Sequence, residues 1–212
     1  GVGGGLVIVP VLVYSFQAHA FDPEVLTQMA IATSLATIIF TSVSSVKAHH
    51  ERGAVRWDLV RLLAPGIVLG TLIGAEVAHR LPGRSLQLLI GLFALLMALQ
   101  MFSNWRPGGT QAEPPPLPGT RGLFAGGSII GLASALFGIG GGSLTVPWLS
   151  YHGTRMQEAV ATSSACGMAI AVAGTLGFVA TGLRAHNLPE QAIGYVYLPA
   201  FIGISISSVL FA

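Results

Sequence analysis

Charged residues are scarce in this 212-residue chain, since Asp, Glu, Lys and Arg together make up 8% of it. Soluble domains contain about 25% charged residues, and a water-facing surface cannot be built from so few. Hydrophobic residues make up 52%, and the mean hydropathy is +0.73. The composition predicts an integral membrane protein with the lipid bilayer as its surroundings. The formal net charge of +2 does not indicate a nucleic-acid partner, and none is expected.

Cysteine is nearly absent, since Cys166 is the only one. A single thiol can form neither an intrachain disulfide nor a thiolate metal cluster. The six histidines lie near the ends of apolar segments and lack the regular spacing of a metal site. No metal or other cofactor is therefore expected. The histidines are interpreted as interfacial, with titration of one of them during function as the alternative.

Long apolar segments, several of them free of charged residues, match the roughly 20 residues that a helix needs to cross the hydrocarbon core. Seven segments are expected, at 1–15, 24–46, 57–79, 84–103, 122–151, 157–181 and 190–212. Polar and apolar residues do not alternate along them as they do in barrel strands. The sequence therefore predicts an all-α, polytopic bundle.

A glycine-rich motif occurs twice. The letters GVGGGLVIVPVL at 1–12 return almost unchanged as GIGGGSLTVPWL at 138–149. The segment after each copy contains ATS, at 32–34 and 161–163. These matches indicate an internal duplication, which is common in secondary transporters.

The duplication predicts two homologous halves, 1–103 and 122–212, joined by a linker at 104–121 that is rich in proline and glycine. The chain opens inside a motif and stops inside an apolar run, so we expect both halves to be truncated at the chain ends. A counterpart of the fourth segment would follow residue 212. The full chain is therefore expected to have about eight segments.

Consecutive glycines followed by a proline are expected to break a membrane helix. A break inside the bilayer is tolerated only where it is buried or lines a wet cavity. A helix that restarts after the glycines points free N–H groups and the positive end of its dipole at the break, which favours an anion. Close helix packing is the alternative use of such glycines.

Hydroxyl groups of the two ATS stretches are expected to complete an anion site without a metal, although each hydroxyl could instead bond its own helix carbonyl. The predicted substrate-binding residues are Gly3, Gly4, Gly5, Thr33, Ser34, Gly140, Gly141, Gly142, Ser143, Thr162 and Ser163. Cys166 lies three residues after Ser163 and four after Thr162. Such spacings share one helix face, so Cys166 is predicted to line the same path.

Lys and Arg fall mainly on one side of the membrane, and the positive-inside rule makes that side cytoplasmic. If all segments cross, this side carries Lys47, Arg52, Arg56, Arg61, Arg106, Arg121 and Arg184, and the other side Arg80, Arg84 and Arg155. If the glycine-rich segments instead enter and return, only Arg155 and Arg184 exchange sides. The charges therefore leave both parallel and inverted repeats open.

The duplicated motif and the following ATS resemble the TauE/SafE sulfite exporter family, also called the toluene sulfonate uptake permease group. The resemblance covers essentially the whole chain. It implies about eight membrane segments in two related halves, the bacterial inner membrane, and movement of sulfite, sulfonates or related sulfur anions.

A transporter of a small anion is therefore the leading hypothesis, with the site at the interface of the two halves and alternating access by rocking. An anion channel or a non-transporting membrane scaffold is an alternative. An intramembrane enzyme would need a nucleophile and a base within reach. No His or Asp lies in the middle of a segment, so an enzyme is not expected.

Overall fold

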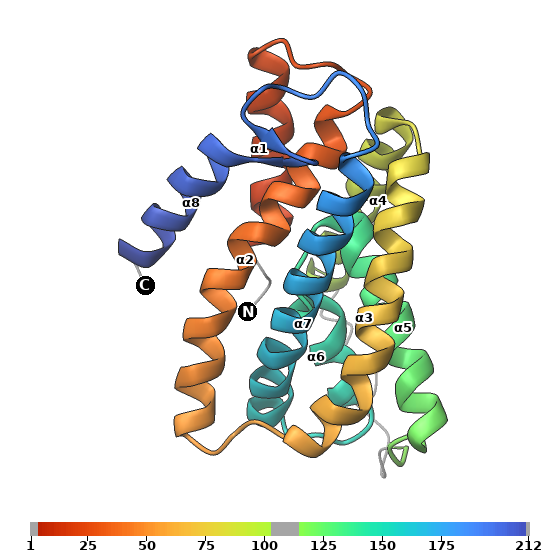
Figure 1. Ribbon diagram of the computed structural model, residues 1–212. Helices are drawn as coiled ribbons and strands as arrows, with labels where there is room; N and C mark the ends of the chain where they lie inside the picture. Colours follow the sequence, from red (N-terminus) through yellow and green to blue (C-terminus); the bar gives the residue numbers. More distant parts are fainter. Residues whose placement is uncertain (1–3, 103–114, 211–212) are drawn as a thin grey trace.

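A computed structural model describes residues 4–102 and 115–210 (Figure 1). Its elements are α1 (Gly5–Ala18), α2 (Leu26–Glu51), α3 (Trp57–Arg80), α4 (Gly83–Phe102), α5 (Thr120–Phe137), α6 (Gly142–Tyr151), α7 (Met156–Gly182), β1 (Ala192–Ile193), β2 (Val196–Tyr197) and α8 (Leu198–Leu210). In the described part, five helices are long and apolar enough to cross a membrane, namely α2, α3, α4, α5 and α7. The prediction of an all-α polytopic membrane protein is confirmed.

The central pair, α2 and α7, is antiparallel (Figure 1). A methyl group on Gly174 would lie 2.8 Å from Leu35, whereas one on Gly167 would lie 4.0 Å from the hydroxyl of Ser42. Residue numbers thus rise along one helix as they fall along the other. Because α2 and α7 each follow one copy of the glycine motif, this arrangement corresponds to inverted repeats.

The fifth expected segment is two helices, α5 and α6, that form a hairpin. Gly138 ends α5 in the left-handed conformation, with φ of +65°, and α6 starts at Gly142. The helices then run back along one another, since a methyl group on Gly126 would lie 2.8 Å from the Trp148 ring. The predicted break is present, and the chain enters the bundle and returns to the same end (Figure 1).

Close packing also uses glycine, but at a different interface, between the parallel helices α3 and α5. Gly66, Gly70 and Gly74 face α5, and a side chain on Gly70 would collide with the carbonyl of Ser128. From the other side, a methyl group on Gly127 would lie 2.6 Å from the Leu63 carbonyl. Small residues let the two backbones approach. Close helix packing by glycine is therefore present here, at glycines outside the duplicated motif.

The last expected segment, 190–212, does not begin as a helix. Ala192–Ile193 pairs with Val196–Tyr197 in a two-stranded hairpin, and α8 begins only at Leu198. Gly194 lies in the turn with φ of +54°, and a methyl group there would lie 2.5 Å from the Val179 carbonyl. The hairpin therefore packs against the end of α7. The run was expected to be helical because it is apolar and uncharged after Glu190, which does not distinguish a short hairpin from a helix.

Aromatic side chains pack together at the end of the bundle at which α1 ends and α2 begins. The rings of Phe16, Phe21 and Tyr197 lie 5.2 to 5.5 Å apart, centroid to centroid. Nearby, Nδ1 of His79 lies 2.8 Å from the hydroxyl of Tyr195. Desolvation by burial raises the pKa of Tyr195, so this phenol stays protonated at neutral pH. These contacts join the hairpin of the second half to helices of the first.

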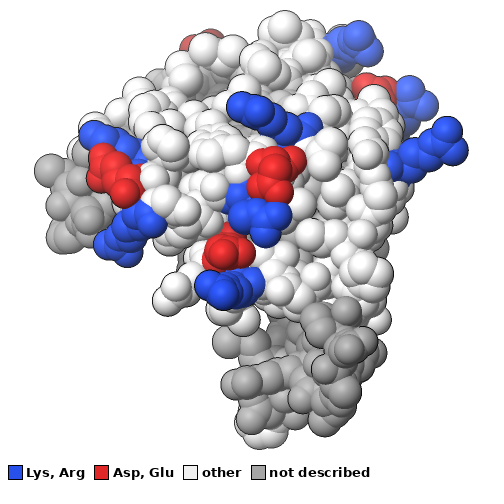
Figure 2. Space-filling view, turned by 90° about the horizontal axis from the view of Figure 1, so that it is seen from below, with Lys and Arg blue, Asp and Glu red and all other residues white. Residues whose placement is uncertain are grey.

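The opposite end of the bundle carries most of the positive charge. Figure 2 shows this end, where blue Lys and Arg side chains are interspersed with a few red carboxylates. With α5 and α6 returning to it, the end includes the loops that hold Arg52, Arg56 and Arg155, while Arg80, Arg84 and Arg184 lie at the other end. The positive-inside rule predicts that the basic end faces the cytoplasm.

Candidate functional site

The two glycine motifs meet in the interior of the protein. A side chain on Gly5 would collide with the carbonyl oxygen of Gly138, and its β-carbon would lie 3.0 Å from the Cα of Ile139. Ser34 stabilises the same contact, since its hydroxyl donates a 2.9 Å hydrogen bond to the Gly138 carbonyl. Glycine is therefore required at this contact because two backbones touch.

Two helices start at this meeting point. Gly4 is the N-cap of α1 and Gly141 is the N-cap of α6, and neither has a side-chain cap. Their carbonyls accept the bonds from Ile8 and Thr145 that open each helix. The first N–H groups of a helix lack intrahelical acceptors and carry partial positive charge. Two such ends at one place favour an anion.

A cavity of about 270 Å³ lies against these helix ends. Its lining residues are Gly4, Ile38, Thr41, Ser42, Ser45, His49, Gly140, Gly141, Gly142, Val160, Ser163, Ser164 and Gly167. From Ile38 to His49 the cavity follows α2 for about 17 Å, at 1.5 Å per residue. Because His49 belongs to the last turn of α2, the cavity extends toward the basic end.

Hydroxyl groups make up much of the cavity wall. Thr41, Ser163 and Ser164 donate to carbonyls three residues earlier in their own helices, at 2.7 to 3.1 Å. The hydroxyls of Ser42 and Ser45 have no hydrogen-bond partner in the described ranges. Their O–H groups are therefore free to donate to a ligand.

Five of the predicted substrate-binding residues line this cavity, namely Gly4, Gly140, Gly141, Gly142 and Ser163. Gly5 lies behind them against Gly138. Gly3 lies outside the described residues. Ser143 is 8% exposed and its hydroxyl has no partner among the described residues, but it is not part of the lining. Cys166 is fully buried and does not line the cavity either.

The two predicted threonines join the halves instead. Oγ1 of Thr33 accepts a 3.1 Å bond from the backbone N–H of Tyr197, just before α8. Oγ1 of Thr162 accepts a 3.1 Å bond from the backbone N–H of Arg56, just before α3. Each threonine is fully buried and holds the start of a helix in the opposite half. The two ATS stretches thus make a pair of reciprocal hydrogen bonds between the halves, from Arg56 to Thr162 and from Tyr197 to Thr33, which we call the clasp.

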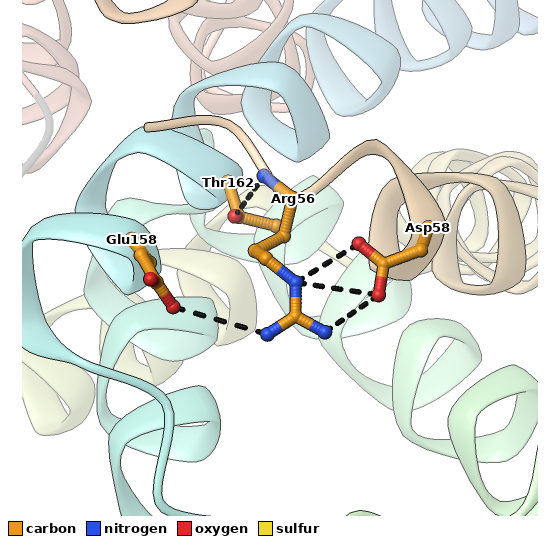
Figure 3. Close-up of polar contacts among 4 residues, drawn as sticks. All are labelled: Arg56, Asp58, Glu158 and Thr162. Atoms are coloured by element: carbon orange, nitrogen blue, oxygen red, sulfur yellow. Dashed lines mark hydrogen bonds and ion pairs between the residues drawn. The ribbon is translucent and has the colours of Figure 1, made fainter. Parts of the chain in front are cut away.

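Arg56 adds ion pairs to this clasp (Figure 3). Its guanidinium lies 2.6 Å from a carboxylate oxygen of Asp58 and 3.8 Å from one of Glu158 on α7. The hydrogen bond with Asp58 raises the pKa of Arg56 above its ordinary value. The side chains of these groups are 31% to 58% exposed, so the pairs orient the loop more than they stabilise it.

Thr162→Val is expected to lower the free energy of unfolding by about 1 kcal/mol, because the Arg56 N–H loses its acceptor while the side-chain volume is kept. Thr33→Val should have a similar effect on the Tyr197 N–H. Thermal unfolding of the purified protein in detergent measures both. Thr175→Val is the matched control, since the Thr175 hydroxyl bonds only the Ala171 carbonyl of its own helix. An equal loss in all three variants would contradict the clasp.

Sequence reasoning missed the contribution of the second half of α2. Thr41, Ser42, Ser45 and His49 follow Ile38 at spacings of 3, 4, 7 and 11 residues, which is one face of a helix. On α7 the residues Val160, Ser163, Ser164 and Gly167 repeat the pattern of 3, 4 and 7. The hydroxyl-rich face of α2 was the available signal. Within the described residues, no group of three or more His, Cys, Asp or Glu side chains is placed to hold a metal ion.

Comparison with known proteins identifies the family. The family described as Sulfite exporter TauE/SafE matches residues 1–212. The chain belongs to this family. The resemblance carried by the duplicated glycine motif is confirmed, and the family's members that are similar to this chain are named as membrane transporters.

A probable membrane transporter protein of Haemophilus influenzae is 36% identical over 98% of this chain and 78% of its own length. The probable membrane transporter protein YunE of Bacillus subtilis is 33% identical over 69% of this chain and 59% of its own length. A probable membrane transporter protein of Methanocaldococcus jannaschii is 24% identical over 99% of this chain and 74% of its own length. No solved structure matches the chain. The relatives identify a multi-pass membrane transporter.

Proposed function

We propose that this protein is a secondary transporter of small anions, in particular sulfite, organosulfonates or related sulfur oxyanions, and that the cavity beside α2, α6 and α7 binds them. The observation that carries the proposal is the convergence of two uncapped helix N-termini, Gly4–Gly5 and Gly141–Gly142, on one hydroxyl-lined cavity. No acidic residue is among the described residues of its lining. Partial positive charge and free hydroxyl donors suit an oxyanion.

The choice of sulfur anions rests on the family's description as sulfite exporters. We also propose a bacterial inner-membrane location, in keeping with the relatives from Haemophilus influenzae and Bacillus subtilis. The cavity itself selects for negative charge and for hydrogen-bond acceptors, which all oxyanions of sulfur share.

Alternating access is supported by the contrast between the two ends of the bundle. The hydroxyl-lined cavity extends along α2 toward the basic end, while Phe16, Phe21 and Tyr197 pack together at the other end, where the hollows beside Phe21 and His79 share no lining residue with it. In inverted repeats, rocking of the halves exchanges such open and closed ends around a central site. This arrangement corresponds to a state open to the predicted cytoplasmic side.

An enzymatic use of the cavity is disfavoured by its chemistry. Ser45 and His49 both line it, but no hydrogen bond joins them to make an activated nucleophile. A channel is distinguished by measurement: a transporter saturates with substrate, whereas a channel conducts without saturating at low concentration. Uptake of radiolabelled sulfite and methanesulfonate into proteoliposomes that contain the full-length chain is the test. Saturable uptake of neither anion would refute the proposal.

Ser42→Ala is expected to raise the KM for the anion roughly tenfold, because a hydrogen bond to a charged group is worth about 1.5 kcal/mol. The Ser42 hydroxyl lines the cavity and has no partner in the described ranges. Ser128→Ala is the control, since Ser128 lies outside the cavity and bonds only the Phe124 carbonyl of its own helix. Uptake kinetics in proteoliposomes measure both. Equal KM values for the two variants would argue against Ser42.

A further inference from the structure

Among the described residues that line the cavity, His49 has the only ionisable side chain. It belongs to the last turn of α2 and is half-buried, one helical turn beyond Ser45. It therefore lies toward the basic end of the cavity, where a ligand from the predicted cytoplasmic side would enter. A charge here acts on the cavity through partly desolvated surroundings, in which electrostatic interactions are stronger than in water.

The ring of His49 differs in its hydrogen bonding from most other histidine rings of the protein. Within the described ranges it has no hydrogen-bond partner. By contrast, Nδ1 of the adjacent His50 accepts a 3.1 Å bond from Nε1 of Trp57. His79 is bonded to Tyr195, and His152 lies 2.8 Å from the Trp148 carbonyl. A free imidazole at a cavity mouth is available to a ligand.

The charges around His49 lie outside the cavity. On α2 they are Lys47 and Glu51. At its C-cap, in the following loop and on α3 they are Arg52, Arg56, Asp58 and Arg61. Before and on α7 they are Arg155 and Glu158, and α1 and α6 carry none in their described residues. Arg56 is paired with Asp58 and Glu158. None of them lines the cavity. The protonation of His49 therefore sets the formal charge of the lining itself.

We propose that His49 is a specificity-determining residue whose protonated form recruits the anion, so that binding from the basic side takes up a proton. This inference rests on the proposed function and adds its proton dependence. Neutral His49 leaves the lining uncharged, and protonation adds one positive charge opposite the helix N-termini. By linkage, a bound anion raises the proton affinity of the imidazole as much as the proton raises the affinity for the anion.

The sign of the effect follows from the chemistry of imidazole, which takes up a proton and a positive charge in more acidic solution. Lowering the pH on the basic side should therefore lower the KM for the anion. Methanesulfonate is the probe, because the charge of this strong-acid anion does not change between about pH 5.5 and about pH 8, the range in which histidine acts as a switch. Sulfite itself titrates in this window and would confound the measurement.

The experiment measures methanesulfonate uptake by proteoliposomes of the full-length protein at about pH 5.5 and about pH 8. The basic end of the protein faces the solution whose pH is varied. We expect the wild-type KM to be about tenfold lower at the acidic pH, which corresponds to about 1.4 kcal/mol of binding free energy. The His49→Gln variant should have, at both pH values, the higher KM that the wild type shows at the alkaline pH. His49→Lys, which restores a positive charge, should give a low KM at both.

His50→Gln is the matched control, since His50 is the neighbouring residue, bonds Trp57 and does not line the cavity. It should keep the wild-type pH profile. A pH dependence that survives in His49→Gln, or that is lost equally in His50→Gln, would overturn the role of His49 and leave anion transport standing. Wild-type liposomes that show no saturable uptake would refute the proposed function and this inference with it.

Discussion

Replacing Gly141 by leucine is expected to abolish anion transport while leaving the protein inserted in the membrane. Gly141 is the N-cap of α6 and lines the cavity. A β-carbon at this position would lie 3.0 Å from Cδ1 of Ile170 and 3.1 Å from Oγ1 of Thr145. A leucine side chain would therefore crowd these neighbours, and we expect it to extend into the cavity that Gly141 lines, displace the anion and shield the first N–H groups of α6.

Gly4→Leu should have the same effect, because Gly4 is the N-cap of α1 and lines the cavity from the other half. Gly91→Leu is the control for a glycine-to-leucine change in a membrane helix, since nothing lies within 4 Å of a β-carbon there. Uptake rates and gel-filtration profiles of the three variants are compared. Wild-type uptake by a well-folded Gly141→Leu protein would remove the anion site from this position.

Gly138→Ala is expected to destabilise the protein by several kcal/mol, the second large effect. Gly138 has φ of +65°, where a residue with a β-carbon pays about 1 kcal/mol or more. The added methyl group would also lie 2.7 Å from Cγ2 of Val9 and 3.2 Å from the Cα of Ile31. The crowding affects the contact between the two glycine motifs, so both halves would have to move apart.

The Gly53→Ala variant separates the contribution of backbone strain from that of crowding. Gly53 has the same φ of +65°, but nothing lies within 4 Å of a β-carbon there. Its replacement should therefore cost only about 1 kcal/mol, for the backbone strain alone. Thermal unfolding in detergent gives both values. Similar losses in the two variants would show that the crowding at Gly138 is relieved without cost.

Duplication in the sequence identified equivalent positions, but it did not reveal what each position does. Thr33 and Thr162 were predicted as substrate ligands because both occur in ATS. In the structure both hydroxyls accept backbone N–H groups from the opposite half. A buried hydroxyl can bind a ligand or a backbone group equally well, and the choice depends on which segment packs beside it. Only the packing of α3 and the hairpin against α2 and α7 supplies those N–H groups.

The sequence by itself determined the membrane surroundings, the helical class and the helix break at 138–141, because these depend on composition and on residues adjacent in the chain. The tertiary structure decided the direction of the halves and the residues of the cavity. Antiparallel packing places the second half of α2 beside the first half of α7, so Ser42 and His49 face the same cavity as Ser163. More than 100 residues separate these positions in sequence, and no local pattern encodes which faces meet, because that depends on the fit of whole helix surfaces.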